Sequence, residues 1–84
     1  MSYTVLWRPS AERDLAQIWI DAADRNQVSK AADAVEQELR RDPLTVGESR
    51  GHVTRIATES PLTILFDVFV EDRKVIVWDV WRSG

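Results

Sequence analysis

The chain has 84 residues, of which 44% are hydrophobic and none is cysteine. This length predicts one small domain over residues 1–84, and the lack of cysteine excludes disulfides, a Cys-based metal site and a Cys nucleophile. The formal net charge of −3 argues against a general nucleic-acid binder, which usually has a basic excess.

Residues 1–9 are too polar for a secretory signal, and no apolar run approaches the roughly 20 residues that cross a bilayer. We therefore expect a soluble, cytoplasmic protein without membrane contact. The single histidine, His52, leaves too few ligands for a histidine-based metal site, so we expect neither metal nor cofactor. A domain this small without cross-links has limited stability of its own, so we expect that a partner or a second copy in a homodimer stabilises it.

The first predicted element is a short strand over residues 3–7. Pro9 ends this strand because it holds Arg8 in the extended region. Ser10 is then placed to cap the helix that follows.

Two helices are predicted next, from apolar residues that recur at helical spacing over 11–22 and 28–39. The first stripe includes Trp19, which we expect in the core. Asp24 and Gln27 have capping-box spacing before the second helix, and Asn26 is the competing cap. Pro43 ends the second helix, so the two helices are expected to lie antiparallel.

Residues 44–51 are interpreted as a loop, and three strands are predicted at 52–58, 62–70 and 74–81. The middle one is apolar at nearly every position, as in a central strand covered on both faces. Residues 71–73 form the turn of a hairpin. The order β-α-α-β-β-β predicts an α+β fold, with a two-helix hairpin packed on a mostly antiparallel four-stranded twisted sheet.

Side chains alternate along a strand, so one sheet face is predicted to be open and polar. With the turn at 71–73, this face carries Thr63, Leu65, Asp67, Val77, Asp79 and Trp81. Trp78 and Val80 are then expected to face the helices. Two carboxylates on this face would repel RNA phosphates. We interpret them as solvated or arginine-paired, because no nucleophile or metal ligand accompanies them as a proton-transfer couple.

Residues 7–19, 42–50 and 65–82 are three stretches that resemble, in chain order, the RelE/ParE family of small toxins. Residues 7–19 are similar to its opening strand and its A-x-x-D-L-x-x-I first helix. Residues 42–50 resemble its P…G…R junction before the sheet, and residues 65–82 resemble its terminal hairpin, which ends in a basic residue. The resemblance covers residues 3–82 and implies the toxin half of a type II toxin–antitoxin pair.

The resemblance also implies a cognate antitoxin that wraps an extended or helical segment over the toxin. RelE-like members cut messenger RNA in the ribosome, and ParE-like members block DNA gyrase. The RelE-like set includes an arginine before the hairpin, an arginine after the last strand and often a C-terminal tyrosine. Arg82 matches the second, whereas Thr63 stands at or beside the first and residues 83–84 hold no tyrosine.

Cleavage of RNA without a metal needs cations and a proton-transfer group. An endoribonuclease would therefore rely on Arg82, Arg55 and His52, although Arg55 and His52 lie on opposite faces of a regular strand. Because this basic set looks incomplete, we favour growth inhibition through a gyrase-type or unknown target. The alternatives are a RelE-type endoribonuclease and a degenerate, inactive binding module.

Three residues are candidates for binding the antitoxin or the target. Trp81 ends the last strand on the polar face, and we interpret it as a partner contact; the alternative is that it completes the core. Arg82 is either an antitoxin contact or a remnant of the catalytic arginine. Arg50, in its glycine-flanked loop, is either a target contact or solvated surface.

Overall fold

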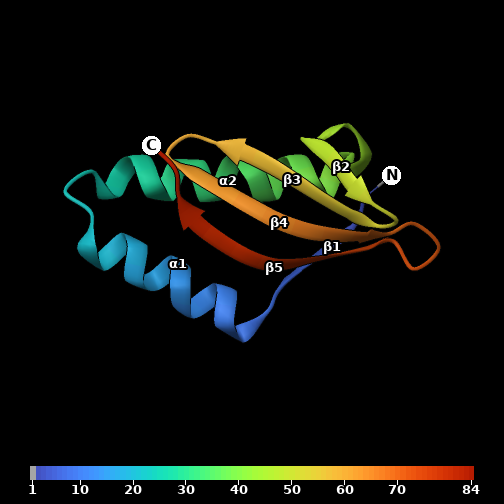
Figure 1. Ribbon diagram of the computed structural model, residues 1–84, viewed down its shortest axis with the longest axis horizontal. Coiled ribbons are helices and arrows are strands. Elements are labelled where there is room, and N and C mark those ends of the chain that lie inside the picture. Colours follow the sequence, from blue (N-terminus) through green and yellow to red (C-terminus); the bar gives the residue numbers. More distant parts are fainter. Residues whose placement is uncertain (1) are drawn as a thin grey trace.

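The computed structural model describes residues 2–84 and contains two helices packed on one mixed five-stranded sheet (Figure 1). Met1, part of the predicted domain, lies outside the described residues. The elements are β1 (Thr4–Trp7), α1 (Pro9–Asp21), α2 (Arg25–Arg41), the 3-10 turn η1 (Pro43–Thr45), β2 (Glu48–Gly51), β3 (Thr54–Glu59), β4 (Leu62–Phe69) and β5 (Lys74–Arg82). The predicted α+β class, with a helix pair on the sheet, is confirmed.

The sheet has the strand order β1-β5-β4-β3-β2, which brings the first and last strands together. β1 runs parallel to β5, with Leu6 opposite Ile76, and every other neighbouring pair is antiparallel. A parallel pair requires a crossover connection, and here the connection contains the helix pair and the other three strands. Both helices follow β1 in the chain and pack against the sheet (Figure 1).

The sheet has one strand more than the predicted four, because β2 occupies part of the segment interpreted as a loop. Glu48 lies opposite Ile56 and Ser49 lies opposite Arg55, so residues 48–51 form an edge strand against β3. All four β2 residues are exposed. An edge strand without a buried side chain shows no apolar alternation, so the pattern gave no signal for it.

A bulge in β5 corrects the predicted faces of that strand. Leu65 lies opposite Asp79 and Phe66 lies opposite Val77, which leaves Trp78 without a partner on β4. The extra residue reverses the alternation on one side of the bulge. Val77 is consequently buried in the core at 0% exposure, and Trp78 is 39% exposed. The predictions that Val77 lies on the open face and that Trp78 faces the helices are both wrong.

The core lies between the helices and the sheet and is almost entirely aliphatic. Its fully buried large side chains are Phe66, Leu39, Leu62, Ile64, Val28, Val35, Val75, Val77 and Pro43. Trp19 is not among them, because 42% of it is exposed and its indole Nε1 donates to Ser29 Oγ at 3.1 Å. The expected core position of Trp19 is therefore wrong.

The helix starts also differ from the predicted caps. α1 begins at Pro9, which suits the first helical position, so Arg8 and not Ser10 is the N-cap. Asp24 is the N-cap of α2, but its side chain makes no capping hydrogen bond, so the predicted capping box does not form. That carboxylate instead binds a residue of β5.

Candidate functional site

The sheet face that points away from the helices is defined by paired residues of β3, β4 and β5. We call it the open sheet face; its members are Thr54, Ile56, Thr58, Thr63, Leu65, Asp67, Phe69, Lys74, Ile76, Asp79 and Trp81. Residues directly opposite one another in a sheet share a face. The predicted placement of Thr63, Leu65, Asp67, Asp79 and Trp81 on one face is thus confirmed.

Hydroxyl groups link the centre of this face. Thr63 Oγ1 donates to Ser83 Oγ at 2.6 Å and lies 3.1 Å from Thr58 Oγ1, and only 6% of Thr63 is exposed. Thr54 Oγ1 donates to Asp67 Oδ1 at 2.6 Å. The position that the family resemblance assigns to a basic residue is therefore a buried hydroxyl with its hydrogen bonds already made.

The two carboxylates of the open sheet face are held by neutral donors. Asp67 accepts from Thr54, and Asp79 Oδ1 accepts from the backbone N–H of Val80 at 3.0 Å. Neither forms an ion pair among residues 2–84. From the sequence, Asp67 and Asp79 are predicted to be solvated or paired with arginine, and the pairing with arginine is wrong. A phosphate backbone on this face would meet two carboxylates, and Lys74 is the cation that the register of β4 and β5 places on the same face.

Trp81 lies opposite Thr63 and is 39% exposed. The indole therefore points outward, as predicted from the alternation. Its diagonal neighbour on β4 is Leu65, whereas Ile76 lies farther along β5, opposite Asp67 on β4 and the exposed Leu6 on β1. An outward indole beside aliphatic side chains is an arrangement typical of binding surfaces.

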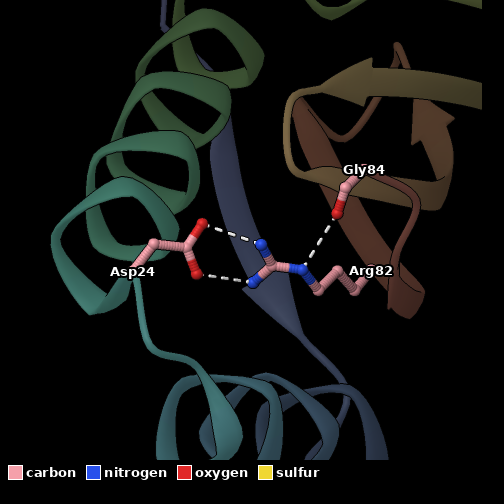
Figure 2. Close-up of polar contacts among 3 residues, drawn as sticks. All are labelled: Asp24, Arg82 and Gly84. Atoms are coloured by element: carbon pink, nitrogen blue, oxygen red, sulfur yellow. Dashed lines mark hydrogen bonds and ion pairs between the residues drawn. The ribbon is translucent and has the colours of Figure 1, made fainter.

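Arg82 lies on the other face of β5, opposite the buried Leu62. Its Nη1 and Nη2 donate to the two Asp24 carboxylate oxygens at 2.9 and 2.7 Å, and its Nε donates to Gly84 O at 3.0 Å (Figure 2). The hydrogen bond from Arg82 lowers the pKa of Asp24, and Asp24 in turn raises the pKa of Arg82. The guanidinium is thus held at the turn between the helices, away from the open sheet face.

Arg55 is bound to backbone carbonyls rather than directed at a ligand. Its Nε donates to Val46 O and its Nη2 to Gly47 O, both at 3.0 Å. Arg55 lies opposite the buried Phe66, so it starts from the helix side of the sheet. Arg55 pairs with Phe66 of β4 and Arg82 pairs with Leu62. These two partners are four residues apart, or roughly 13 Å along the strand.

His52 lies in the turn between β2 and β3, exposed and with a positive φ of 47°. Arg50 is exposed on the edge strand β2. The structure therefore does not bring together His52, Arg55 and Arg82, the three residues considered for catalysis. Within residues 2–84 no cluster of three or more His, Asp or Glu is arranged to hold a metal ion, and neither helix could cross a membrane.

A groove that the sequence did not indicate lies between α1 and α2. We call it the interhelix groove; it has a volume of about 570 Å³, and its apolar lining is Leu15, Ala16, Trp19, Ile20, Val28 and Ala32. Trp7 of β1 also reaches it, and its indole Nε1 donates to Glu36 Oε1 at 3.0 Å. In the sequence, the adjacent apolar residues Trp19 and Ile20 could have indicated this groove. The helical stripe instead led us to expect Trp19 in the core.

No family model matches the chain, and no curated protein matches it in sequence. Solved structures do match its fold. A chain of the toxin–antitoxin complex RelBE2 from Mycobacterium tuberculosis superimposes with a TM-score of 0.80 at 22% identity, covering 98% of this chain and 99% of that one.

Two further matches come from P. aeruginosa and Pyrococcus horikoshii. A chain of the chromosomal ParDE system of P. aeruginosa has a TM-score of 0.69 at 22% identity, covering 99% of this chain and 98% of that one. A chain of the archaeal RelE–RelB complex from Pyrococcus horikoshii has a TM-score of 0.65 at 17% identity, covering 100% and 98%. The structural neighbours are RelE/ParE toxins, and the fold of this chain is the RelE/ParE toxin fold.

Proposed function

We propose that the chain, acting as one domain in the cytoplasm, is the toxin of a type II toxin–antitoxin module and is neutralised by a cognate antitoxin protein. The observation that carries the proposal is the match over the whole chain to structures described as toxin–antitoxin complexes. The match covers nearly all of both chains in each case, so no element of either fold is left over.

The open sheet face supports binding of a protein partner. It presents the outward Trp81 diagonally across from Leu65, and an aromatic residue in such a setting is a frequent centre of binding energy. Asp67 and Asp79 give the same face hydrogen-bond acceptors for a partner's N–H groups. An antitoxin that covers this surface would also stabilise the fold of a domain whose own core is small.

For the cellular target, we favour a gyrase-type or other macromolecular target over messenger RNA. Cleavage of RNA needs cations directed at the phosphate, but Arg82 is paired with Asp24 and Arg55 is bound to two carbonyls. The open sheet face adds two carboxylates and the chain has a net charge of −3. Each of these features disfavours an RNA substrate.

An endoribonuclease is the second candidate, because the structural neighbours include the isolated RelE toxin of E. coli, with a TM-score of 0.60 at 19% identity. Primer extension on transcripts from induced cells separates the two. The favoured proposal predicts no discrete cuts. Ribosome-dependent cuts that disappear in Arg82→Ala would establish the nuclease instead.

The antitoxin half of the proposal is tested with the protein encoded beside this chain. Co-expression of that protein should restore growth to cells that the chain alone arrests, and the two purified proteins should form a complex in calorimetric titration. Restored growth without a complex would point to an indirect effect. A neighbouring protein that neither binds nor restores growth would contradict the assignment of an antitoxin.

A further inference from the structure

The bulge in β5 exposes an indole that a regular strand would bury. By the alternation that buries Val80, Trp78 would also face the core. Instead Trp78 has no partner on β4, and 39% of it is exposed. Bulges often re-aim a side chain in this way at a functional surface. The outward position of Trp78 therefore calls for a partner that covers it.

Trp78 lies in an exposed patch that spans β1 and β5. We call it the bulge patch; its members are Leu6, Arg8, Ile76, Trp78 and Asp79. Leu6 lies opposite Ile76 and is 46% exposed. Arg8 follows Leu6 by two residues, and its backbone N–H continues the ladder to β5 by donating to Val77 O at 3.0 Å, so it shares the face of Leu6. Exposed apolar side chains that gather in one patch mark an interaction site.

The bulge patch carries one cation and one carboxylate that are available to a partner. The guanidinium carbon of Arg8 lies 4.2 Å from the centre of the Trp78 ring, so the indole holds the cation in place. Asp79 Oδ1 accepts from the backbone N–H of the next residue, Val80, at 3.0 Å. Neither ion pair found within residues 2–84 involves Arg8 or Asp79.

A second copy of this chain fits both charges of the bulge patch. Arg8 and Asp79 belong to neighbouring strand lines, about 4.8 Å apart, and they are nearly level because Arg8 follows Trp7, the partner of Val77. A two-fold axis that runs parallel to these strands and midway between them exchanges the two positions. Arg8 of each copy then lies over Asp79 of the other, with both Trp78 rings near the axis.

Two sheets packed face to face also suit the side chains at the centre of the bulge patch. Packed sheets lie about 10 Å apart with their strands nearly aligned, and apolar side chains from both faces fill that layer. Leu6, Ile76 and Trp78 of the two copies supply this filling.

Partners with a single sign of charge fit the bulge patch less well. A nucleic acid or an acidic peptide would satisfy Arg8 but would place its own negative charges beside Asp79. A basic peptide would pair with Asp79 and repel Arg8. Self-association leaves neither charge opposed, because each copy brings the complement of the other.

We propose that the chain forms a symmetric homodimer through the bulge patch, with Trp78 and Leu6 at the centre and two Arg8–Asp79 ion pairs at the flanks. The dimer needs neither an antitoxin nor a target, so it does not depend on the proposed function. An antitoxin on the open sheet face would compete with the second copy, since Asp79 belongs to both surfaces. This competition, unlike the dimer itself, rests on the proposed function.

Sedimentation of the purified full chain over a concentration series tests the dimer. Wild type should be mainly a dimer at about 100 µM and a monomer after dilution. Arg8→Glu and Asp79→Arg should each weaken the dimer at least tenfold, because each sets like charges against one another at both flanks. Arg13→Glu and Asp14→Arg are the matched controls; both residues are exposed on α1, outside the bulge patch, and should leave the dimer unchanged.

A mixture of the two charge variants decides how the copies pair. Equal amounts of Arg8→Glu and Asp79→Arg should dimerise as wild type does, because both flanks again join opposite charges. Trp78→Ala should also weaken the dimer at least tenfold, and circular dichroism reports whether each variant is folded. A wild-type chain that is monomeric at every concentration would overturn the proposal. So would a mixture of folded variants that dimerises no better than its components.

The sedimentation and growth assays fail independently. A dimer formed by a chain that does not inhibit growth would support the bulge patch and reject the toxin proposal. A monomeric chain that inhibits growth would reject the dimer and leave the toxin proposal standing.

Discussion

Arg82 and Asp24 are 58 positions apart in the sequence, yet their bidentate ion pair joins the end of β5 to the turn between the two helices (Figure 2). This pair places Arg82 on the helix side of the sheet, whereas Trp81, its neighbour in the chain, lies on the open sheet face. The two residues therefore cannot serve as one flat contact, and their roles are tested separately.

Asp24→Asn should lower the melting temperature of the free chain at neutral pH by less than about 5 °C, since the pair is partly exposed to solvent. Arg82 lowers the pKa of Asp24, so the stabilisation is complete above the ordinary pKa of 3.8 and is lost as the pH falls through the lowered value. The difference between variant and wild type should therefore shrink well below pH 3.8. A difference that grows under those conditions would contradict the role given to the pair.

Glu59→Gln should raise the melting temperature at neutral pH. Desolvation and the nearby Glu38 raise the pKa of Glu59, so its charged form opposes folding. That cost is absent below the ordinary pKa of 4.5 and appears as the pH rises through the raised value. We expect a gain of roughly 2–4 °C at pH 7 that vanishes near pH 4. An equal gain at both pH values would exclude the electrostatic explanation.

Gly47→Ala should destabilise the fold by about 3 kcal/mol. Gly47 has a φ of +66°, and an added Cβ would collide with the backbone carbonyl of Ile56. Gly51→Ala is the matched control, because Gly51 also has a positive φ of +118° but its Cβ would meet nothing within 4 Å. Denaturant unfolding should show the larger loss at Gly47. Equal losses would mean that backbone strain alone accounts for both.

Trp81→Ala should weaken antitoxin binding by about 2 kcal/mol or more, roughly thirtyfold, while the melting temperature changes little. The reason is its outward position opposite Thr63. Val80→Ala is the opposite control, because Val80 is only 3% exposed; it should cost about 2 kcal/mol of stability. Calorimetric titration beside thermal melts distinguishes the two. Unchanged affinity together with a large drop in melting temperature would make Trp81 a core residue.

The sequence was sufficient for the elements whose residues alternate between core and solvent. The alternation along β4 predicted that Thr63 and Asp67 share a face, because Ile64 and Phe66, the alternate residues between them, point into the core. Helical spacing likewise identified Val28, Val35 and Leu39 as buried residues of α2. Local pattern and burial agree in these elements, so the prediction holds without knowledge of the tertiary contacts.

Features that depend on distant partners could not be read from the sequence. The bulge at Trp78 reverses the faces of β5 without any glycine to mark it, and β2 is a strand only because β3 is available to pair with it. Arg82 looked available for a substrate because its partner Asp24 is 58 residues away. The distance between the candidate catalytic residues could not be predicted for the same reason. The register between β3 and β4 sets the position of Arg55, and spacing in the chain does not.

The growth of bacteria after induction of the chain alone is the measurement that tests whether the chain is a toxin. Growth should stop within a few generations for wild type and continue for the destabilised Gly47→Ala, with immunoblots showing soluble wild-type protein. Colony counts after removal of the inducer report whether cells survive the arrest. Normal growth in the presence of soluble, folded wild-type protein would contradict the toxin assignment and leave the chain as a binding module with a toxin fold.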